Sequence, residues 1–149
     1  MEDRYLYKAK TTPKEKGEFN NVWVTGNLIV SNGKYYIHPV GNVVNVKNET
    51  GRIIVMHEVI PDTICRCTES KDKNGKLIWE NDIASYSDLI TRDKKTICIE
   101  RNKMQASFVR KYRSPMGLQY LYLDEYIASR MEVIGNIFDN PELLESEEK

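Results

Sequence analysis

The feature that most constrains this chain is a series of short runs of β-branched and aromatic residues, each ended by turn residues. The clearest case is Asn32-Gly33, which separates the β-rich residues 22–30 from residues 34–37. Both positions of a two-residue Asn-Gly loop accept the positive φ of a type I′ turn, so the pattern predicts a β-hairpin. Short strands joined by tight turns favour antiparallel sheets over a layered α/β fold.

The same pattern continues along the chain. Residues 43–47 and 52–56 predict a second hairpin around a loop at residues 48–51. Residues 96–100 and 107–110 predict a third hairpin. Each pair combines β-prone residues with a polar connection, which is typical of antiparallel neighbours.

Helical signals are confined to the last third of the chain. Residues 118–127 fit both helical and strand spacing, and we expect a strand that gives way to a helical turn near Asp124. Residues 133–137 predict a late strand. Asn140-Pro141 then predicts the start of a short helix, because asparagine caps helices and proline suits the first helical position.

These elements predict a mainly β protein, a β-rich α+β fold, in two parts. Pro61 interrupts the pattern, so we expect an N-terminal antiparallel β-hairpin region over residues 1–60. Residues 61–149 are expected to form a small β-barrel or roll with a short terminal helical turn.

Four segments carry a family resemblance. Two lie in the C-terminal half, residues 71–83 (KDKNGKLIWENDI) and residues 132–144 (EVIGNIFDNPELL). Two lie earlier, residues 5–10 (YLYKAK) and residues 23–29 (WVTGNLI). Together, in this order, they resemble the YopX family, small proteins carried by bacteriophages and prophages. The resemblance covers most of the chain and is weak over residues 42–60 and 85–126.

The resemblance implies more than the pattern of strands does. It implies that the C-terminal part is an SH3-like barrel or roll, that the protein comes from a phage or prophage, and that it is a homo-oligomer. It implies no established activity. The family usually has glycine where this chain has Glu69 and Asn81. Asparagine tolerates a left-handed backbone, so Asn81 is expected to keep the turn, whereas a positive φ at Glu69 would be strained.

The residue types of the two signature segments indicate folding roles. Asn74-Gly75 is expected to reverse the chain, Trp79 and Ile83 to fill a core, and Gly135 to allow a close backbone approach. The signature therefore predicts a scaffold, and we expect any working surface where the resemblance fades, within residues 85–126.

The cysteines and histidines were weighed as metal ligands. Cys65 and Cys67 share one strand face, and with Cys98, His38 or His57 they are chemically able to bind zinc. Structural zinc sites usually use Cys-x2–4-Cys pairs, which this chain lacks. Buried strand cysteines explain the pattern better, so we expect no metal and no cofactor.

No motif indicates catalysis. The histidines are accompanied by no nucleophile elbow, no His-Glu-x-x-His sequence and no phosphate-binding glycine loop. Glu80 and Asp82 alternate on a strand, and their neighbours suggest a turn with solvated acids rather than an acid–base pair. We expect a protein without catalytic residues that is not an enzyme.

A basic stretch gives the candidate binding residues. Between residues 92 and 113 eight basic residues face only two acids, and from residue 124 onward the balance reverses to acidic. Cations interleaved with an aromatic ring on both halves of a hairpin are typical of nucleic-acid or partner-binding faces. A solvated or interface role is favoured over nucleic acid, because the net charge is +0. The candidates are Arg101, Lys103, Arg110, Lys111, Tyr112 and Arg113.

Partners and location follow from charge and hydropathy. A basic and an acidic segment on one chain can attract each other between copies, so we expect a homo-oligomer. The alternatives are a nucleic-acid-binding module using residues 92–113, or an anti-defence protein that sequesters a host protein or a nucleotide signal. No apolar run approaches the roughly 20 residues that span a bilayer, and the charged start leads into no signal peptide. The expected location is the host bacterial cytoplasm, where the three cysteines stay reduced.

Overall fold

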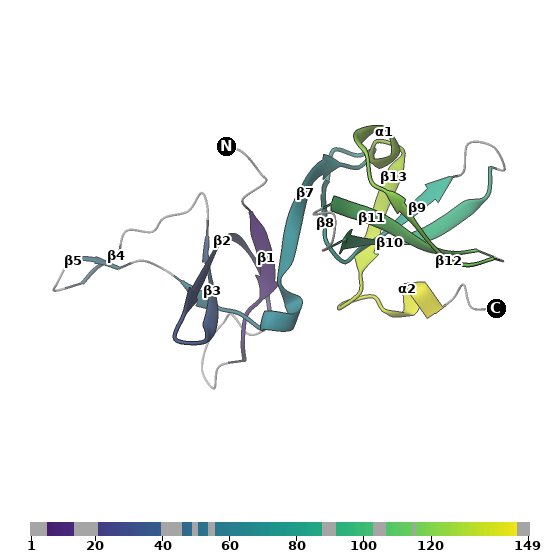
Figure 1. Ribbon diagram of the computed structural model, residues 1–149. Coiled ribbons are helices and arrows are strands. Elements are labelled where there is room, and N and C mark those ends of the chain that lie inside the picture. Colours follow the sequence, from purple (N-terminus) through teal and green to yellow (C-terminus); the bar gives the residue numbers. More distant parts are fainter. Residues whose placement is uncertain are drawn as a thin grey trace. The chain divides into compact units, whose positions relative to one another are not determined.

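The computed structural model describes residues 6–13, 21–39, 46–48, 51–53, 56–87, 92–102, 107–114 and 116–145. The chain divides into two compact units, Met1–Arg66 and Cys67–Lys149, and the division falls inside strand β7. The protein is mainly β, as the sequence predicts, and its strands form antiparallel sheets (Figure 1). No helix among the residues described is long and apolar enough to cross a membrane.

The first unit is built on antiparallel strands around a small core. Its main sheet has the order β6-β3-β2-β1, with the start of β7 paired to β1, and β4 and β5 form a separate hairpin. Ala9, Ile37 and Val59 form its cluster of buried core residues in the described part of the unit. The strands are β1 (Tyr7–Lys10), β2 (Trp23–Ser31), β3 (Lys34–Pro39), β4 (Val46–Asn48), β5 (Gly51–Ile53), β6 (His57–Glu58) and β7 (Cys65–Lys71), and Pro61–Thr63 form the 3-10 turn η2.

The hairpin predicted at Asn32-Gly33 is confirmed. Ser31 pairs with Lys34, and Asn32 and Gly33 take φ values of 52° and 73°, as a type I′ turn requires. The second predicted hairpin is also confirmed, although its strands end at Asn48 and restart at Gly51, so its loop is shorter than expected. Residues 43–45 and 54–55, predicted to extend it, lie outside the described residues.

The second unit contains a five-stranded antiparallel sheet with the order β12-β11-β10-β9-β13, and its strand β8 pairs with the end of β7. The third predicted hairpin is confirmed as β10–β11, and the strand before Asp124 is confirmed as β12. Asp124 caps α1, because its Oδ1 accepts a hydrogen bond from the Ile127 N–H at 2.7 Å. The elements are β8 (Leu77–Trp79), β9 (Asp82–Ser87), β10 (Lys94–Asn102), β11 (Ser107–Ser114), β12 (Gly117–Tyr122), α1 (Glu125–Ala128), β13 (Met131–Asn136) and α2 (Glu142–Glu145).

The described residues form no closed barrel, and the SH3-like detail of the expected barrel or roll stays a prediction. β12 and β13 lie at opposite ends of the sheet order, and no pairing joins them among the described strands, so the sheet is open. Turn dipeptides fix neighbouring strands, whereas closure depends on pairing between strands far apart in sequence, which no local pattern encodes.

The two positions where the family usually has glycine both take a left-handed backbone. Asn81 has a φ of 70° and Glu69 a φ of 69°. Glu69 lies where the β7–β8 register shifts between Cys67 and Lys71, and such bulges commonly use glycine in this conformation. The strain expected at Glu69 is therefore present, because a non-glycine residue there loses about 1–2 kcal/mol.

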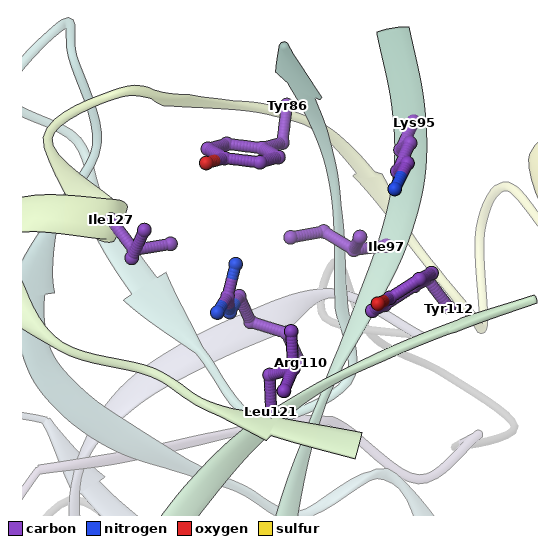
Figure 2. A pocket seen from close by; sticks show the side chains of 7 residues that line it. All are labelled: Tyr86, Lys95, Ile97, Arg110, Tyr112, Leu121 and Ile127. Atoms are coloured by element: carbon purple, nitrogen blue, oxygen red, sulfur yellow. The ribbon is translucent and has the colours of Figure 1, made fainter. Parts of the chain in front are cut away.

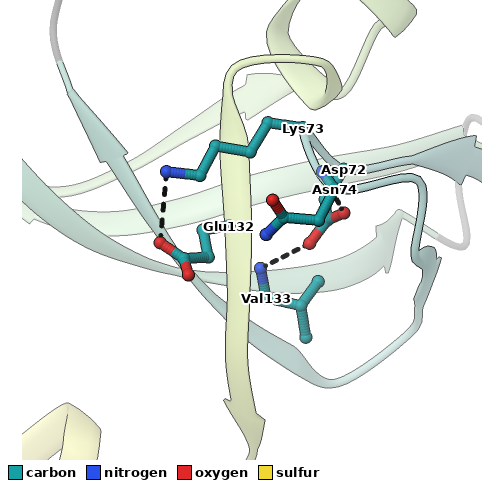
Figure 3. A network of polar contacts seen from close by, with 5 residues as sticks. All are labelled: Asp72, Lys73, Asn74, Glu132 and Val133. Carbon is teal, nitrogen blue, oxygen red and sulfur yellow. Dashed lines mark hydrogen bonds and ion pairs between the residues drawn. The ribbon is translucent and has the colours of Figure 1, made fainter.

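The β7–β8 turn is held to β13 by the buried carboxylate of Asp72 (Figure 3). Its Oδ1 accepts hydrogen bonds from the backbone N–H groups of Asn74 and Lys76, both at 2.9 Å, and its Oδ2 accepts one from Val133 at 3.0 Å. Burial raises the pKa of Asp72, but these three hydrogen bonds outweigh burial and leave the pKa below its usual 3.8.

The signature segments have the folding roles expected of them, with one difference. Trp79 and Ile83 are buried, and Gly75 turns the chain with a φ of 79°. Gly135 makes room for a side chain rather than for backbone. A Cβ there would approach the side chain of Asn140, whose Oδ1 accepts a hydrogen bond from Asn136.

Candidate functional site

The strand register of the β10–β11 hairpin sorts the basic residues onto two faces of the sheet. Ile99 lies opposite Arg110, and Ile99 is part of the hydrophobic core. Cys98 lies opposite Lys111, one residue out of phase with that pair. Because side chains of directly paired residues point to the same face, Arg110 lies on the core face and Lys111 on the opposite face. The predicted basic stretch is therefore not one contiguous surface.

Lys111 is engaged in a local ion pair on the opposite face. Its Nζ lies 3.1 Å from Oε1 of Glu100, which occupies the neighbouring strand. The hydrogen bond that Lys111 donates to Glu100 raises the pKa of Lys111 and exceeds the opposing effect of burial. This pairing gives Lys111 a structural partner within the sheet.

The core face carries a pocket of about 170 Å³ near the outer strands (Figure 2). Four strands and helix α1 build its walls. Lys95 of β10 lies opposite Tyr86 of β9, and Arg110 of β11 lies opposite Leu121 of β12. The pocket therefore follows from the antiparallel register. Its lining residues are Tyr86, Lys95, Ile97, Arg110, Tyr112, Leu121 and Ile127.

Both cations of the pocket, Lys95 and Arg110, make a cation–π contact with an aromatic ring. Lys95 Nζ lies 4.8 Å from the centroid of the Tyr112 ring, and Arg110 Cζ lies 5.7 Å from that of Tyr86. Arg110 Nε also donates a hydrogen bond to the Tyr122 carbonyl at 3.1 Å. Two of the seven lining side chains are cationic and none is acidic, so the pocket is electropositive.

The six predicted site residues are thus divided. Arg110 and Tyr112 line the pocket, and Arg101, opposite Phe108, shares their face without lining it. Lys111 faces the other way. Lys103 lies outside the described residues, and Arg113 lies in β11 with its side chain outside the described part.

Sequence reasoning missed Tyr86 and Lys95 as pocket residues. They face each other across β9 and β10, whose connection includes residues 88–91. Lys95 belongs to the basic stretch, but whether its side chain reaches the pocket depends on the pairing register between β9 and β10. Strand alternation at residues 82, 84 and 86 was the available signal for Tyr86, since Ala84 and Tyr86 are both in the core.

The interpretation of Asp82 as a solvated acid is wrong. Asp82 is buried, and its Oδ2 accepts a hydrogen bond from the Trp79 N–H at 2.8 Å. The turn between β8 and β9 folds the carboxylate back onto the backbone, which compensates its burial. Cys65 and Cys67 are buried on one face with Arg66 exposed between them. Within the described ranges no three or more His, Cys, Asp or Glu residues are grouped to hold a metal ion.

The outermost strand, β12, presents an apolar face of Leu118, Tyr120 and Tyr122. These side chains alternate along the strand and are 51%, 54% and 58% exposed. β12 pairs with β11 on one side, and in the described part of the chain no strand covers its other side. Exposed apolar strand edges are rare in monomeric proteins and mark interaction surfaces.

The described part of the second unit thus combines an open antiparallel sheet, an electropositive aromatic pocket and an apolar edge strand. The family model of the YopX protein matches residues 4–145, nearly the whole chain. The chain therefore belongs to the YopX family, as the four segments indicated. No relative is found among curated proteins.

Proposed function

We propose that this YopX family protein is a phage or prophage accessory protein that binds rather than catalyses and acts as a homo-oligomer in the host bacterial cytoplasm. Family membership supports the general class. The observation that carries the homo-oligomer is the exposed edge of β12, with Leu118, Tyr120 and Tyr122.

The chemistry of β12 suits pairing with a second copy of itself. Its sequence, GLQYLY, has no charged residue, so two copies side by side bring no like charges together. Antiparallel pairing about a two-fold axis would satisfy the outward backbone groups of both strands and continue the sheet. Tyrosines at such a contact bury large rings while their hydroxyls stay near water.

The absence of catalysis is supported by how the second unit uses its buried acids. Asp72 accepts three backbone hydrogen bonds and Asp82 accepts one, and each fixes a turn. These carboxylates are occupied in folding, so the buried groups best able to acquire catalytic pKa values serve the scaffold.

Replacing Tyr120 with lysine is expected to dissociate the oligomer. A lysine at the centre of the β12 contact places unpaired charge in an apolar interface, so the dissociation constant should rise at least about tenfold. Analytical ultracentrifugation measures this against multiples of the 17.4 kDa chain mass. Val30→Lys, at an apolar residue 59% exposed in the first unit, is the matched control and should leave the mass unchanged. A monomeric wild-type protein would overturn the proposal.

The alternatives differ in how the structure supports them. Nucleic-acid binding by residues 92–113 as one basic face is weakened, because Arg110 and Lys111 lie on opposite faces. Sequestration of a host protein has no distinguishing feature. Sequestration of a nucleotide signal is favoured by one observation, a pocket lined by Arg110, Tyr86 and Tyr112.

A further inference from the structure

We infer that the pocket lined by Tyr86, Lys95, Arg110 and Tyr112 binds one nucleotide unit, an aromatic base together with its phosphate. The inference extends the proposed function, since it names what this binding protein takes up. The ligand chemistry has two possible sources, a free nucleotide and a residue of a single strand.

The walls supply one surface for each part of a nucleotide. Tyr86 and Tyr112 offer aromatic rings, and bases stack on such rings whatever their sequence. Ile97, Leu121 and Ile127 add an aliphatic lining that excludes water from a flat apolar ring. Inorganic phosphate alone would leave these apolar surfaces uncovered, and an uncharged apolar ligand would make no use of the positive charge of Lys95 and Arg110.

The cations are held where a phosphate can reach them. Figure 2 shows the Arg110 guanidinium directed toward Tyr86 and Ile127, with Lys95 and Tyr112 on the other side of the space. The Nε bond to the Tyr122 carbonyl fixes the guanidinium plane. A guanidinium held in this way presents its remaining N–H groups in the fork that matches phosphate oxygens.

The size of the pocket decides how much ligand it takes. Sites for drug-sized ligands span about 300–1,000 Å³, whereas this pocket has about 170 Å³. A pocket of this volume favours a single nucleotide unit over a whole dinucleotide cofactor. Six of the seven lining side chains come from sheet strands and Ile127 from helix α1, and such elements position side chains more firmly than loops do, so the site needs little rearrangement to bind.

The test measures binding of three probes to the full chain at low salt: AMP, a fluorescein-labelled ten-residue oligothymidylate, and inorganic phosphate. AMP and phosphate are followed by calorimetry and the oligonucleotide by fluorescence anisotropy. We expect saturable binding of AMP or the oligonucleotide, and much weaker binding of phosphate. Similar affinities for AMP and the oligonucleotide indicate a free nucleotide as ligand. Tighter, salt-sensitive binding of the oligonucleotide indicates a single strand.

Arg110→Gln and Tyr112→Leu should each weaken binding about tenfold, since each removes a phosphate contact or a stacking surface. Arg101→Gln is the matched control, because Arg101 is a cation of the same hairpin and sheet face that does not line the pocket. Circular dichroism melts confirm that each variant folds. The inference is overturned if no probe saturates, if phosphate binds as well as AMP, or if Arg101→Gln weakens binding as much as Arg110→Gln. An oligomer that binds no probe would overturn this inference and leave the proposed function standing, whereas turnover of AMP would contradict the proposed function instead.

Discussion

Replacing Asp72 with alanine is expected to lower the free energy of unfolding of the second unit by about 3 kcal/mol. The carboxylate accepts three backbone hydrogen bonds, from Asn74, Lys76 and Val133, and the last ties the turn to a strand 61 residues away. Hydrogen bonds to a charged group contribute about 1.5–3 kcal/mol each, and they are not additive within one network. Alanine would leave all three donors without this partner.

The loss is measured by the fluorescence of a single tryptophan in each unfolding experiment. Trp79 lies in the second unit and Trp23 in the first, so denaturant unfolding in a Trp23→Phe background follows the second unit alone. Asp72→Asn is the control, because its amide oxygen keeps part of the network and should restore about half of the loss. A loss below about 0.5 kcal/mol for Asp72→Ala, the size of an ordinary surface change, would contradict the role given to Asp72.

The contribution of Asp72 should also depend on pH. Its folded-state pKa is lowered from 3.8, so the unfolded state binds the proton more readily. The stabilisation is therefore complete above the unfolded pKa of 3.8 and is lost as the pH falls through the folded pKa. The difference in stability between wild type and Asp72→Ala should be constant near neutral pH and should shrink below about pH 4.

Replacing Gly26 with alanine is expected to destabilise the first unit by about 3 kcal/mol or more. Gly26 lies on β2 between Tyr7 of β1 and Pro39 of β3. An added Cβ would run into the His38 carbonyl, 2.7 Å from its carbon, and would lie 2.9 Å from the Cα of Pro39. The obstacle is backbone, so relief requires moving the strand rather than rotating a side chain.

Trp23 fluorescence in a Trp79→Phe background follows this loss in the first unit. Gly33→Ala is the matched control, because Gly33 has a φ of 73° but nothing near its Cβ, and it should cost about 1 kcal/mol. If the two substitutions destabilised equally, the loss for Gly26→Ala would come from the lost conformational freedom of glycine and not from the close approach of β3.

What the sequence predicted well was local. Asn32-Gly33, Asn74-Gly75 and the helical turn near Asp124 depend on their own backbone and immediate neighbours, and the structure contains all three. What it missed depends on partners distant in sequence or on the fold of a turn. Whether the five-stranded sheet closes depends on pairing between its end strands β12 and β13, which no local pattern encodes. The burial of Asp82 depends on the β8–β9 turn, which brings its carboxylate to the Trp79 N–H.

In the candidate site, too, local composition was predictive and the arrangement of strands was not. The basic composition of residues 92–113 drew attention to Arg110 and Tyr112, which line the pocket. The same composition included Lys111, which the strand register places on the other face beside Glu100. Composition locates a charged stretch, whereas only register decides which charges share a surface.

Hydrogen exchange measured at two protein concentrations tests most directly whether β12 joins copies of the chain. In a monomer, the amides within residues 118–121 that point away from β11 should exchange quickly, while those paired to β11 are protected. If β12 pairs with β12, the outward amides become protected as concentration rises, and the inward ones serve as an internal control. We predict this concentration-dependent protection within residues 118–121. Outward amides that exchange equally fast at both concentrations, in a sample of single-chain mass, would contradict the account.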